Sequence, residues 1–278
     1  MKISFFGTGA AEGVPAMFCS CQFCNEIRKS GISEYRTRSQ VLIDGKLSVD
    51  FPPDAYAHSL HYGADYSSLE YLLVTHSHMD HFYAHDFILR GYKYASLIGR
   101  KLRIYGNEEV KKVFCECTAR EMRGDVAENI EVKVVRAFQQ LVIGDYRVLT
   151  LPANHGTAEE ALLYYVERQG KGYLHLCDTG ALSDKSVEFL AVNSAKADLV
   201  TFDCTFLDAV PRAGTRHMCI EDNMEIKRRL MQAGVADGNT GYVITHFSHN
   251  CRPSRERVEQ VSESYGVLGA YDGMTVEI

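Results

Sequence analysis

The chain has 278 residues, of which 46% are hydrophobic, and it carries a formal charge of −6. This length suits one large α/β domain or two small ones, and the acidic balance argues against a protein that binds nucleic acid through its overall charge. The apolar run at the N-terminus is broken by Gly7 and Gly9, and no later segment approaches membrane-spanning length. The chain has nine cysteines, an odd number that cannot all pair in disulfides. We therefore expect a cytoplasmic protein in a reducing compartment, with a small-molecule substrate, no membrane partner and nucleic acid disfavoured.

Short apolar runs rich in β-forming residues recur along the whole chain. They predict strands at residues 3–6, 40–43, 47–51, 69–75, 102–105, 130–135, 146–151, 161–166, 172–177, 199–202 and 242–245. Helical periodicity lies between them, at about residues 82–97, 107–122, 184–194, 221–233 and 254–264. Ser183 and Asp184 can cap the third helix, Gly234 follows the fourth, and Pro253-Ser254 opens the last.

Two features of this pattern bear on domain organisation. The strands at 40–43 and 47–51 are joined by the turn Asp44-Gly45, which predicts a hairpin. From about residue 161 onward, strands and helices alternate, and no linker, charge block or repeat divides the chain. The prediction is a single α/β domain over residues 1–278, with either one mixed sheet or a pair of sheets covered by helices.

The histidines are concentrated after one apolar strand. The segment Tyr71–His81 reads as a buried strand that ends abruptly in His76, His78, Asp80 and His81. Because the two histidines are two residues apart, they can point toward one metal, while Asp80 and His81 in the following turn can reach a second.

Three later apolar runs also end in metal-ligating residue types. They end in His155, Asp178 and His246. Each is weak evidence alone, because a histidine at a strand end is usually a loop residue and an aspartate there can make a turn. Together they indicate one site, since loops at strand ends are where a sheet scaffold gathers functional side chains.

These residues resemble the metallo-β-lactamase superfamily, whose fold is an αββα sandwich of two mixed sheets with helices on the outer faces. The run from His76 to His81 matches its His-x-His-x-Asp-His motif, and the three later residues match its other ligands in order. The resemblance implies that His76, His78 and His155 hold one metal, that Asp80, His81 and His246 hold the other, and that Asp178 bridges them. Asp50 matches an early aspartate that supports the site from behind. The oxygen-reducing branch has a glutamate where this chain has His78, so the hydrolytic branch is favoured.

Hydrolysis of a phosphodiester needs a hydroxide, neutralised phosphoryl oxygens and a proton for the leaving group. Imidazoles and carboxylates suit Zn²⁺, and the carboxylates also admit Mn²⁺ or Fe²⁺. His217, in the loop before the helix at 221–233, is the candidate general acid, the alternative being a surface loop histidine. A matching histidine in phosphodiesterase members supports the assignment. Asp80 is counted with it among the catalytic residues.

Cys19, Cys21 and Cys24 lie close together and are one ligand short of a closed tetrahedral zinc site. With the preceding Gly-Thr-Gly and Gly-Val-Pro, they resemble the phosphoribosyl cyclic phosphodiesterases of the carbon-phosphorus lyase pathway. In that branch the cysteines belong to a structural zinc site, and a second histidine follows the last active-site ligand by three residues. The resemblance implies that His249 is the fourth ligand. Cys251 competes for that place, and a redox pair or unliganded thiols are the other interpretations.

The leading prediction is a phosphodiesterase that uses two divalent ions at its active site, plus one structural zinc, to hydrolyse a small phosphodiester, cyclic ones included. Residues 83–128 do not follow the pattern of that branch, which leaves the substrate open. The alternatives are a tRNA-processing endonuclease of the same superfamily and a non-catalytic metal-binding or cofactor-biosynthesis accessory protein, similar to the pyrroloquinoline quinone accessory members. A homo-oligomer is compatible with all three.

Overall fold

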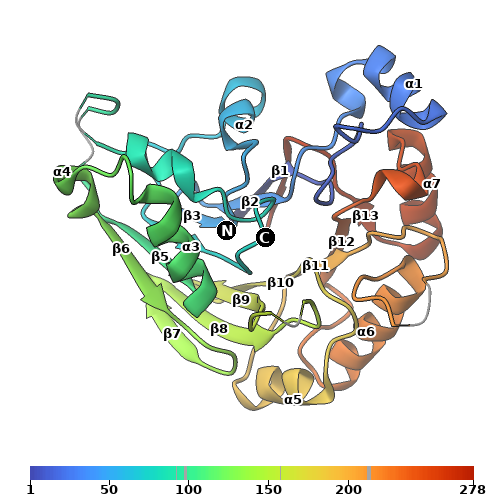
Figure 1. The fold of residues 1–278 in the computed structure, drawn as a ribbon. Helices are drawn as coiled ribbons and strands as arrows, with labels where there is room; N and C mark the ends of the chain where they lie inside the picture. Colours follow the sequence, from blue (N-terminus) through green and yellow to red (C-terminus); the bar gives the residue numbers. More distant parts are fainter. Residues whose placement is uncertain (92, 97–98, 157, 212–213) are drawn as a thin grey trace.

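Two mixed β-sheets face each other, and helices cover their outer faces (Figure 1). The computed structural model describes residues 1–91, 93–96, 99–156, 158–211 and 214–278. The arrangement is the αββα sandwich predicted from the sequence. Within the described residues, the helices are all too short or too polar to cross a membrane.

The first sheet has the strand order β14-β1-β2-β3-β4-β5-β6. Its strands are β1 (Lys2–Gly7), β2 (Gln40–Ile43), β3 (Leu47–Val49), β4 (Tyr71–Leu73), β5 (Leu102–Gly106), β6 (Ile130–Val134) and β14 (Met274–Glu277). The strands from β3 to β6 run parallel, whereas β14, β1, β2 and β3 pair antiparallel.

The second sheet has the order β13-β12-β11-β10-β9-β8-β7. Its strands are β7 (Gln140–Ile143), β8 (Tyr146–Pro152), β9 (Leu162–Arg168), β10 (Lys171–Leu176), β11 (Leu199–Asp203), β12 (Gly241–Thr245) and β13 (Leu268–Gly269). The strands from β10 to β13 run parallel, and the strands from β7 to β10 pair antiparallel. Each sheet therefore joins a parallel half to an antiparallel half.

The α-helices are α1 (Gln22–Ser30), α2 (Ala55–Tyr62), α3 (Glu108–Thr118), α4 (Gly124–Ala127), α5 (Asp184–Val192), α6 (Ile220–Gln232) and α7 (Arg255–Tyr265). Short 3₁₀ turns are η1 (Ile32–Glu34), η2 (Ala84–Leu89) and η3 (His249–Cys251). Helices α2, α3 and α4 pack on the first sheet, and α5, α6 and α7 pack on the second.

The apolar side chains form three layers. Phe5 and Tyr164 belong to the layer between the sheets, Leu190 and Leu230 to the layer under α5 and α6, and Val110 to the layer under α3. All five are fully buried. Burial of such a side chain contributes about 1.5–3 kcal/mol, so the three layers fix the sheets and thereby the loops at their ends.

Several local predictions are confirmed. Asp44 and Gly45 both have left-handed backbone, with φ of 51° and 70°, and they join β2 to β3 in an antiparallel hairpin. The hydroxyls of Ser183 and Ser254 accept hydrogen bonds from the first turns of α5 and α7. Gly234 follows the end of α6 with φ of 68°.

The helix predicted at residues 82–97 is wrong. The chain forms only the 3₁₀ turn η2 there, and residues 92 and 97 lie outside the described part. Phe87 of this turn enters the core with its ring 4.9 Å from that of Phe51. A Cβ on Gly91 would lie 2.5 Å from a methyl of Val126, so this segment packs closely against α4. Tertiary packing thus overrides the local helical pattern.

A buried polar network joins the two ends of the chain near β1. The Asp272 carboxylate accepts hydrogen bonds from the Thr8 hydroxyl and from the backbone N–H and hydroxyl of Thr37. The Thr8 hydroxyl in turn accepts one from the buried guanidinium of Arg36. Burial raises the pKa of Asp272 to about 6, against these hydrogen bonds, which lower it.

This carboxyl group makes stability depend on pH. Because its pKa is raised in the folded chain, its contribution is complete below about pH 4 and is lost as the pH rises through about 6. We expect the wild type to lose about 1.4 kcal/mol of unfolding free energy, relative to Asp272→Asn, between about pH 5 and pH 8. Urea unfolding of both proteins measures the difference, with the exposed Asp145→Asn as control. A difference that stays constant with pH would contradict the prediction.

Candidate metal centre

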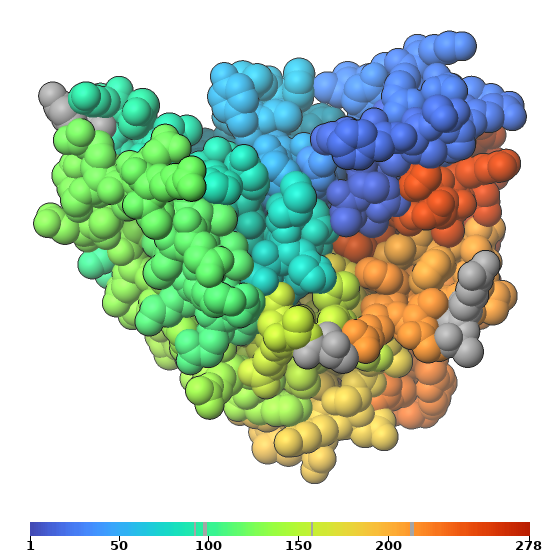
Figure 2. All heavy atoms as spheres, in the orientation of Figure 1, coloured from blue at the N-terminus to red at the C-terminus, as the bar shows by residue number. Residues whose placement is uncertain are grey.

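The predicted ligands follow strands whose carboxyl ends lie at one edge of the sandwich. Asp50 follows β3, Asp178 comes after β10 and His246 follows β12. All three have left-handed backbone, with φ of 63°, 55° and 64°. This conformation costs about 1–3 kcal/mol at a residue with a side chain, and it clusters at functional sites. Figure 2 shows a hollow in one face, bordered by the cyan segment after β4, the yellow-green loop after β8 and the orange segment after β11.

One group of potential ligands, here called the first tetrad, comprises His76, His78, His155 and Asp178. Each offers one ligand atom, and these atoms lie within 4.8 Å of one another. His76 Nε2 lies 2.9 Å from His78 Nδ1 and 3.3 Å from Asp178 Oδ2. His78 is exposed, whereas His76 and Asp178 are buried. The first tetrad therefore opens to solvent at His78.

A second group, here called the second tetrad, comprises Asp80, His81, Asp178 and His246. All four are buried, and their ligand atoms also lie within 4.8 Å of one another. His81 Nε2 lies 3.3 Å from Asp80 Oδ2 and 3.2 Å from Asp178 Oδ2. Its other ring nitrogen lies 2.6 Å from Asp50 Oδ2. Asp50 therefore holds the imidazole with Nε2 directed at the tetrad, as a carboxylate behind a metal-binding histidine does.

The electrostatics of His81 follow from these neighbours. Burial would lower its pKa, but the charges of Asp50 and Asp80 outweigh burial and raise it well above the ordinary value. Burial likewise raises the pKa of Asp50, although His81 opposes the shift. The imidazole and the carboxylates are thus a strongly interacting set in which positive charge is favoured.

Four buried atoms of the two tetrads make no hydrogen bond within the described residues. They are His81 Nε2, His155 Nδ1, His246 Nε2 and Asp178 Oδ1. His155 Nδ1 and Asp178 Oδ1 lie only 3.1 Å apart but do not have hydrogen-bond geometry. An unsatisfied buried polar atom costs about 1–3 kcal/mol, and two divalent cations, one in each tetrad, would satisfy all four. Imidazole nitrogens and carboxylate oxygens are ligands that Zn²⁺ and Mn²⁺ accept, so the donor set fits divalent ions.

His217 lies beside these tetrads. Its Nδ1 is 3.2 Å from Asp178 Oδ1 and 3.2 Å from Asp203 Oδ2. Burial would lower the pKa of His217, but the hydrogen bond and charge of Asp203 raise it to about 9. Burial would raise the pKa of Asp203, but bonds from His217 and His246 lower it to about 2. The structure thus brings the predicted general acid to the site paired with the Asp203 carboxylate, which raises the pKa of its imidazole.

Asp203 was missed in the sequence. It is fully buried at the end of β11, and it contacts the two histidines His217 and His246. Together with Asp178 these residues form a further group with metal-ligand spacing. The signal that could have identified Asp203 is the same one used for the other ligands, an apolar strand that ends in an aspartate.

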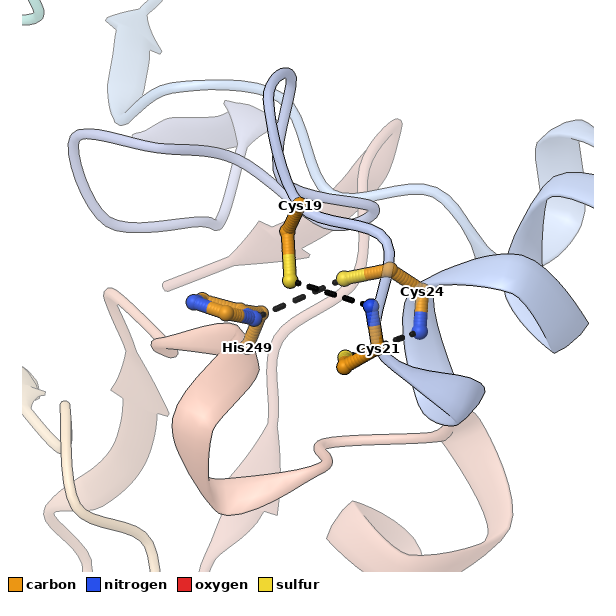
Figure 3. A group of neighbouring side chains, drawn as sticks. All are labelled: Cys19, Cys21, Cys24 and His249. Carbon is orange, nitrogen blue, oxygen red and sulfur yellow. Dashed lines mark hydrogen bonds between the residues drawn. The ribbon is translucent and has the colours of Figure 1, made fainter.

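The cysteine cluster forms a separate site at the N-terminal end of α1. Figure 3 shows Cys19, Cys21, Cys24 and His249 pointing toward one another, and their ligand atoms lie within 4.8 Å of one another. Cys24 Sγ lies 3.4 Å from His249 Nδ1. Cys251, the competing ligand, is buried in η3 and does not belong to this group within the described residues.

Hydrogen bonds connect the N-terminal segment to the loop after β12. The backbone N–H of Ala10 donates to Phe247 O, and the N–H of Phe247 donates to Thr8 O, both at 3.0 Å. The Glu12 carboxylate accepts from the hydroxyl of Ser248 at 2.7 Å and from the backbone N–H of His249 at 3.2 Å. The cysteine cluster and the second tetrad therefore share one short loop.

The family model described as "Beta-lactamase superfamily domain" matches residues 40–247. The chain belongs to the beta-lactamase superfamily. The matched range contains both tetrads and His217 and leaves out the cysteine cluster. Solved structures with this fold include a diphosphatase and a possible metal-dependent hydrolase from Veillonella parvula, which is the enzyme class predicted from the sequence.

Solved structures resemble the whole chain. A diphosphatase of the PhnP family has a TM-score of 0.72 at 22% identity, covering 100% of this chain and 97% of that one. The short form of human tRNase Z has a TM-score of 0.70 at 17% identity, covering 100% and 99%. Zn²⁺-bound PqqB from Methylobacterium extorquens has a TM-score of 0.65 at 18% identity, covering 100% of both chains. At these identities the likeness shows the fold.

A stretch of 85 residues is 34% identical to part of an octanoyltransferase from Porphyromonas gingivalis. The match covers 29% of this chain and 16% of that protein. The chain thus corresponds to a small part of that relative's length.

Proposed function

We propose that the chain is a metal-dependent phosphodiesterase that hydrolyses a small phosphodiester at a dinuclear centre. The observation that carries the proposal is that two tetrads share Asp178 and contain four buried atoms with no hydrogen bond to any described residue. A shared carboxylate between two sets of imidazoles is the donor set that two adjacent divalent ions require.

In this proposal His76, His78 and His155 hold one ion, Asp80, His81 and His246 hold the other, and Asp178 binds both. Zn²⁺ and Mn²⁺ both suit these donors, and Fe²⁺ is admitted by the carboxylates. Such ions, when bound, supply a hydroxide nucleophile at neutral pH and neutralise phosphoryl oxygens. The exposed side of the first tetrad at His78 gives a phosphodiester access to them.

His217 supplies the proton in this mechanism. Its pairing with Asp203 through Nδ1 leaves Nε2 as the nitrogen that can donate to the leaving oxygen. Asp203 also contacts His246 at 3.3 Å, so one carboxylate orients both the acid and a ligand. General acid catalysis by a positioned histidine contributes about 10²–10⁴-fold to the rate.

Replacement of His217 with alanine tests this role. We expect hydrolysis of diphenyl phosphate to fall by about 100-fold or more, because phenolate is a poor leaving group that needs the proton. Hydrolysis of bis-p-nitrophenyl phosphate should fall less, because nitrophenolate departs more readily without a proton. Both rates are measured in Mn²⁺ and in Zn²⁺, together with the metal content of the variant.

The exposed His61 of α2 provides the matched control, since His61→Ala removes a surface imidazole away from the tetrads. Equal losses on both substrates in His217→Ala, or a loss of metal, would show that His217 acts as a ligand and not as the acid. No hydrolysis of either ester by the wild type with metal bound would favour the accessory protein. A steep salt dependence of tRNA binding would favour the endonuclease.

The proposal includes a third, structural Zn²⁺ held by Cys19, Cys21, Cys24 and His249. Three thiolates and an imidazole make a closed set that leaves no position for substrate. None of the nine cysteines, all of which lie in the described part of the chain, forms a disulfide, which fits a reducing, cytoplasmic setting. We also propose that residues 1–278 act as one domain, because the last strand of the chain pairs with the first.

A further inference from the structure

Glu159 links the two loops that carry the histidines of the first tetrad. It lies between β8 and β9, in the same loop as His155, and it is half-buried. Its carboxylate accepts hydrogen bonds from the backbone N–H of Ser77 at 3.0 Å and from the Ser77 hydroxyl at 2.8 Å. Ser77 stands between His76 and His78, so the carboxylate holds the backbone from which both imidazoles extend.

The same carboxylate is anchored on its other side by Asn107. The Asn107 side-chain amide donates to Glu159 Oε2 at 2.7 Å and to the backbone carbonyl of Glu160 at 2.9 Å. Its carbonyl oxygen accepts from the backbone N–H of Val110 and caps α3. Glu159 is therefore fixed against a helix, and the two histidine loops are tied to that helix through it.

His78 lacks the supporting partners that the histidines of the second tetrad have. In the second tetrad, His81 is held from behind by Asp50, and His246 is held by Asp203 and the Thr205 hydroxyl. Within the described residues, the imidazole of His78 makes hydrogen bonds only to other histidines of its own tetrad. Its orientation accordingly depends on the backbone at Ser77.

We propose that Glu159 is a positioning residue for the first tetrad, which it organises through Ser77 without binding metal. The inference rests on the proposed dinuclear function. It predicts that loss of the carboxylate weakens one metal site and spares the other, because the histidines of the second tetrad keep their own carboxylates. Partners behind metal ligands typically account for about 10–100-fold in metal affinity.

Cobalt titration of the full chain tests the proposal. Active-site ions are removed by mild chelation, and Co²⁺ binding is followed by calorimetry and visible absorption in the wild type, Glu159→Gln and Glu159→Ala. We expect one of two binding steps to weaken by about 10–100-fold in Glu159→Ala, with the other unchanged. The affinity of the weakened step in Glu159→Gln should lie between those of the wild type and Glu159→Ala. The glutamine oxygen still accepts a hydrogen bond from Ser77, but the glutamine N–H₂ group would face the N–H₂ group of Asn107, and both are donors.

Glu160→Gln is the matched control. It removes the same charge from the adjacent position, where the carboxylate is exposed and accepts a hydrogen bond from the Ala137 N–H. Unchanged affinity in Glu159→Ala, or an equal loss at both steps, would overturn the proposal, since a general loosening of the fold affects both sites. If the cobalt result is as expected but the wild type hydrolyses no phosphodiester, the proposed function fails and the positioning role stands.

Discussion

Replacement of Asp178 with asparagine is expected to remove both active-site ions and to lower phosphodiester hydrolysis by about 1,000-fold or more, equivalent to roughly 4 kcal/mol of barrier. Asp178 is the residue common to both tetrads, and its oxygens lie 3.1–3.3 Å from nitrogens of His76, His81 and His155. A neutral amide offers a single carbonyl oxygen and no charge, so it cannot serve two cations.

Asparagine is the informative substitution at this position. The backbone of Asp178 is left-handed, with φ of 55°, and asparagine tolerates that conformation better than most residues. The variant therefore tests the charge with little added backbone strain. Asp145→Asn, at an exposed turn before β8, is the control for loss of a carboxylate.

Metal analysis and turnover are the two measurements. We expect about three metals per wild-type chain, one of them resistant to mild chelation, and about one per Asp178→Asn chain. Two easily removed metals in the wild type would count against the structural zinc. A variant that keeps all its metal and its turnover would contradict the shared role of Asp178.

The residues of the tetrads could be read from the sequence because each ends or follows an apolar strand. The carboxyl ends of parallel strands meet at one edge, so a local pattern of strand followed by ligand carries three-dimensional information. Asp203 follows the same rule at the end of β11, so the pattern offers it as a candidate ligand, but nothing beside it in the sequence indicates its partners His217 and His246. Its role comes from the position of β11 between β10 and β12, which only the fold shows.

Other elements could not be predicted because long-range packing defines them. The pattern at residues 82–97 suggested a helix, but Phe87 is drawn into the core and the chain turns. Strands β13 and β14 are short, and they exist because they pair with β12 and β1. The role of Glu159 could not be predicted for the same reason, because its partners Ser77 and Asn107 are far away in the sequence.

Replacement of Cys21 with serine is expected to release the structural zinc and also to weaken catalysis at the second tetrad. Cys21 is the N-cap residue of α1, where its sulfur accepts from the Cys24 N–H at 3.4 Å. Serine is among the best N-cap residues, so the helix keeps its cap while the metal loses a ligand. The effect therefore reports on the zinc rather than on the helix.

The expected loss of stability is large. Structural zinc contributes about 10–16 kcal/mol to the folding of small metal-dependent domains, which is an upper limit for a chain with its own apolar core. A net loss of several kcal/mol would lower the unfolding temperature by on the order of 10 °C in a protein of this size. Cys115→Ser, in the exposed part of α3, is the control for loss of a thiol.

Catalysis should fall because a zinc ion bound by the cysteine cluster would hold the loop that carries His246. That residue has left-handed backbone with φ of 64°, and the next residue, Phe247, is bonded on both sides to the segment from Thr8 to Ala10. Release of His249 from the zinc would loosen this loop, so that His246 is oriented less firmly. Loss of such support typically costs about 10–100-fold in metal affinity or in activity. We therefore expect turnover to fall by about 10-fold while two metals remain bound.

Metal content and turnover of Cys21→Ser, compared with Cys251→Ser, decide between the candidate ligands. Because Cys251 lies outside the cluster, its serine variant should keep about three metals per chain, whereas Cys21→Ser should keep about two. Loss of zinc from Cys251→Ser would mean that Cys251, and not His249, is the fourth zinc ligand. Full turnover in a Cys21→Ser protein that has lost its zinc would contradict the prediction. It would mean that the sheet alone orients His246 and that zinc binding at the cysteine cluster does not affect the active site.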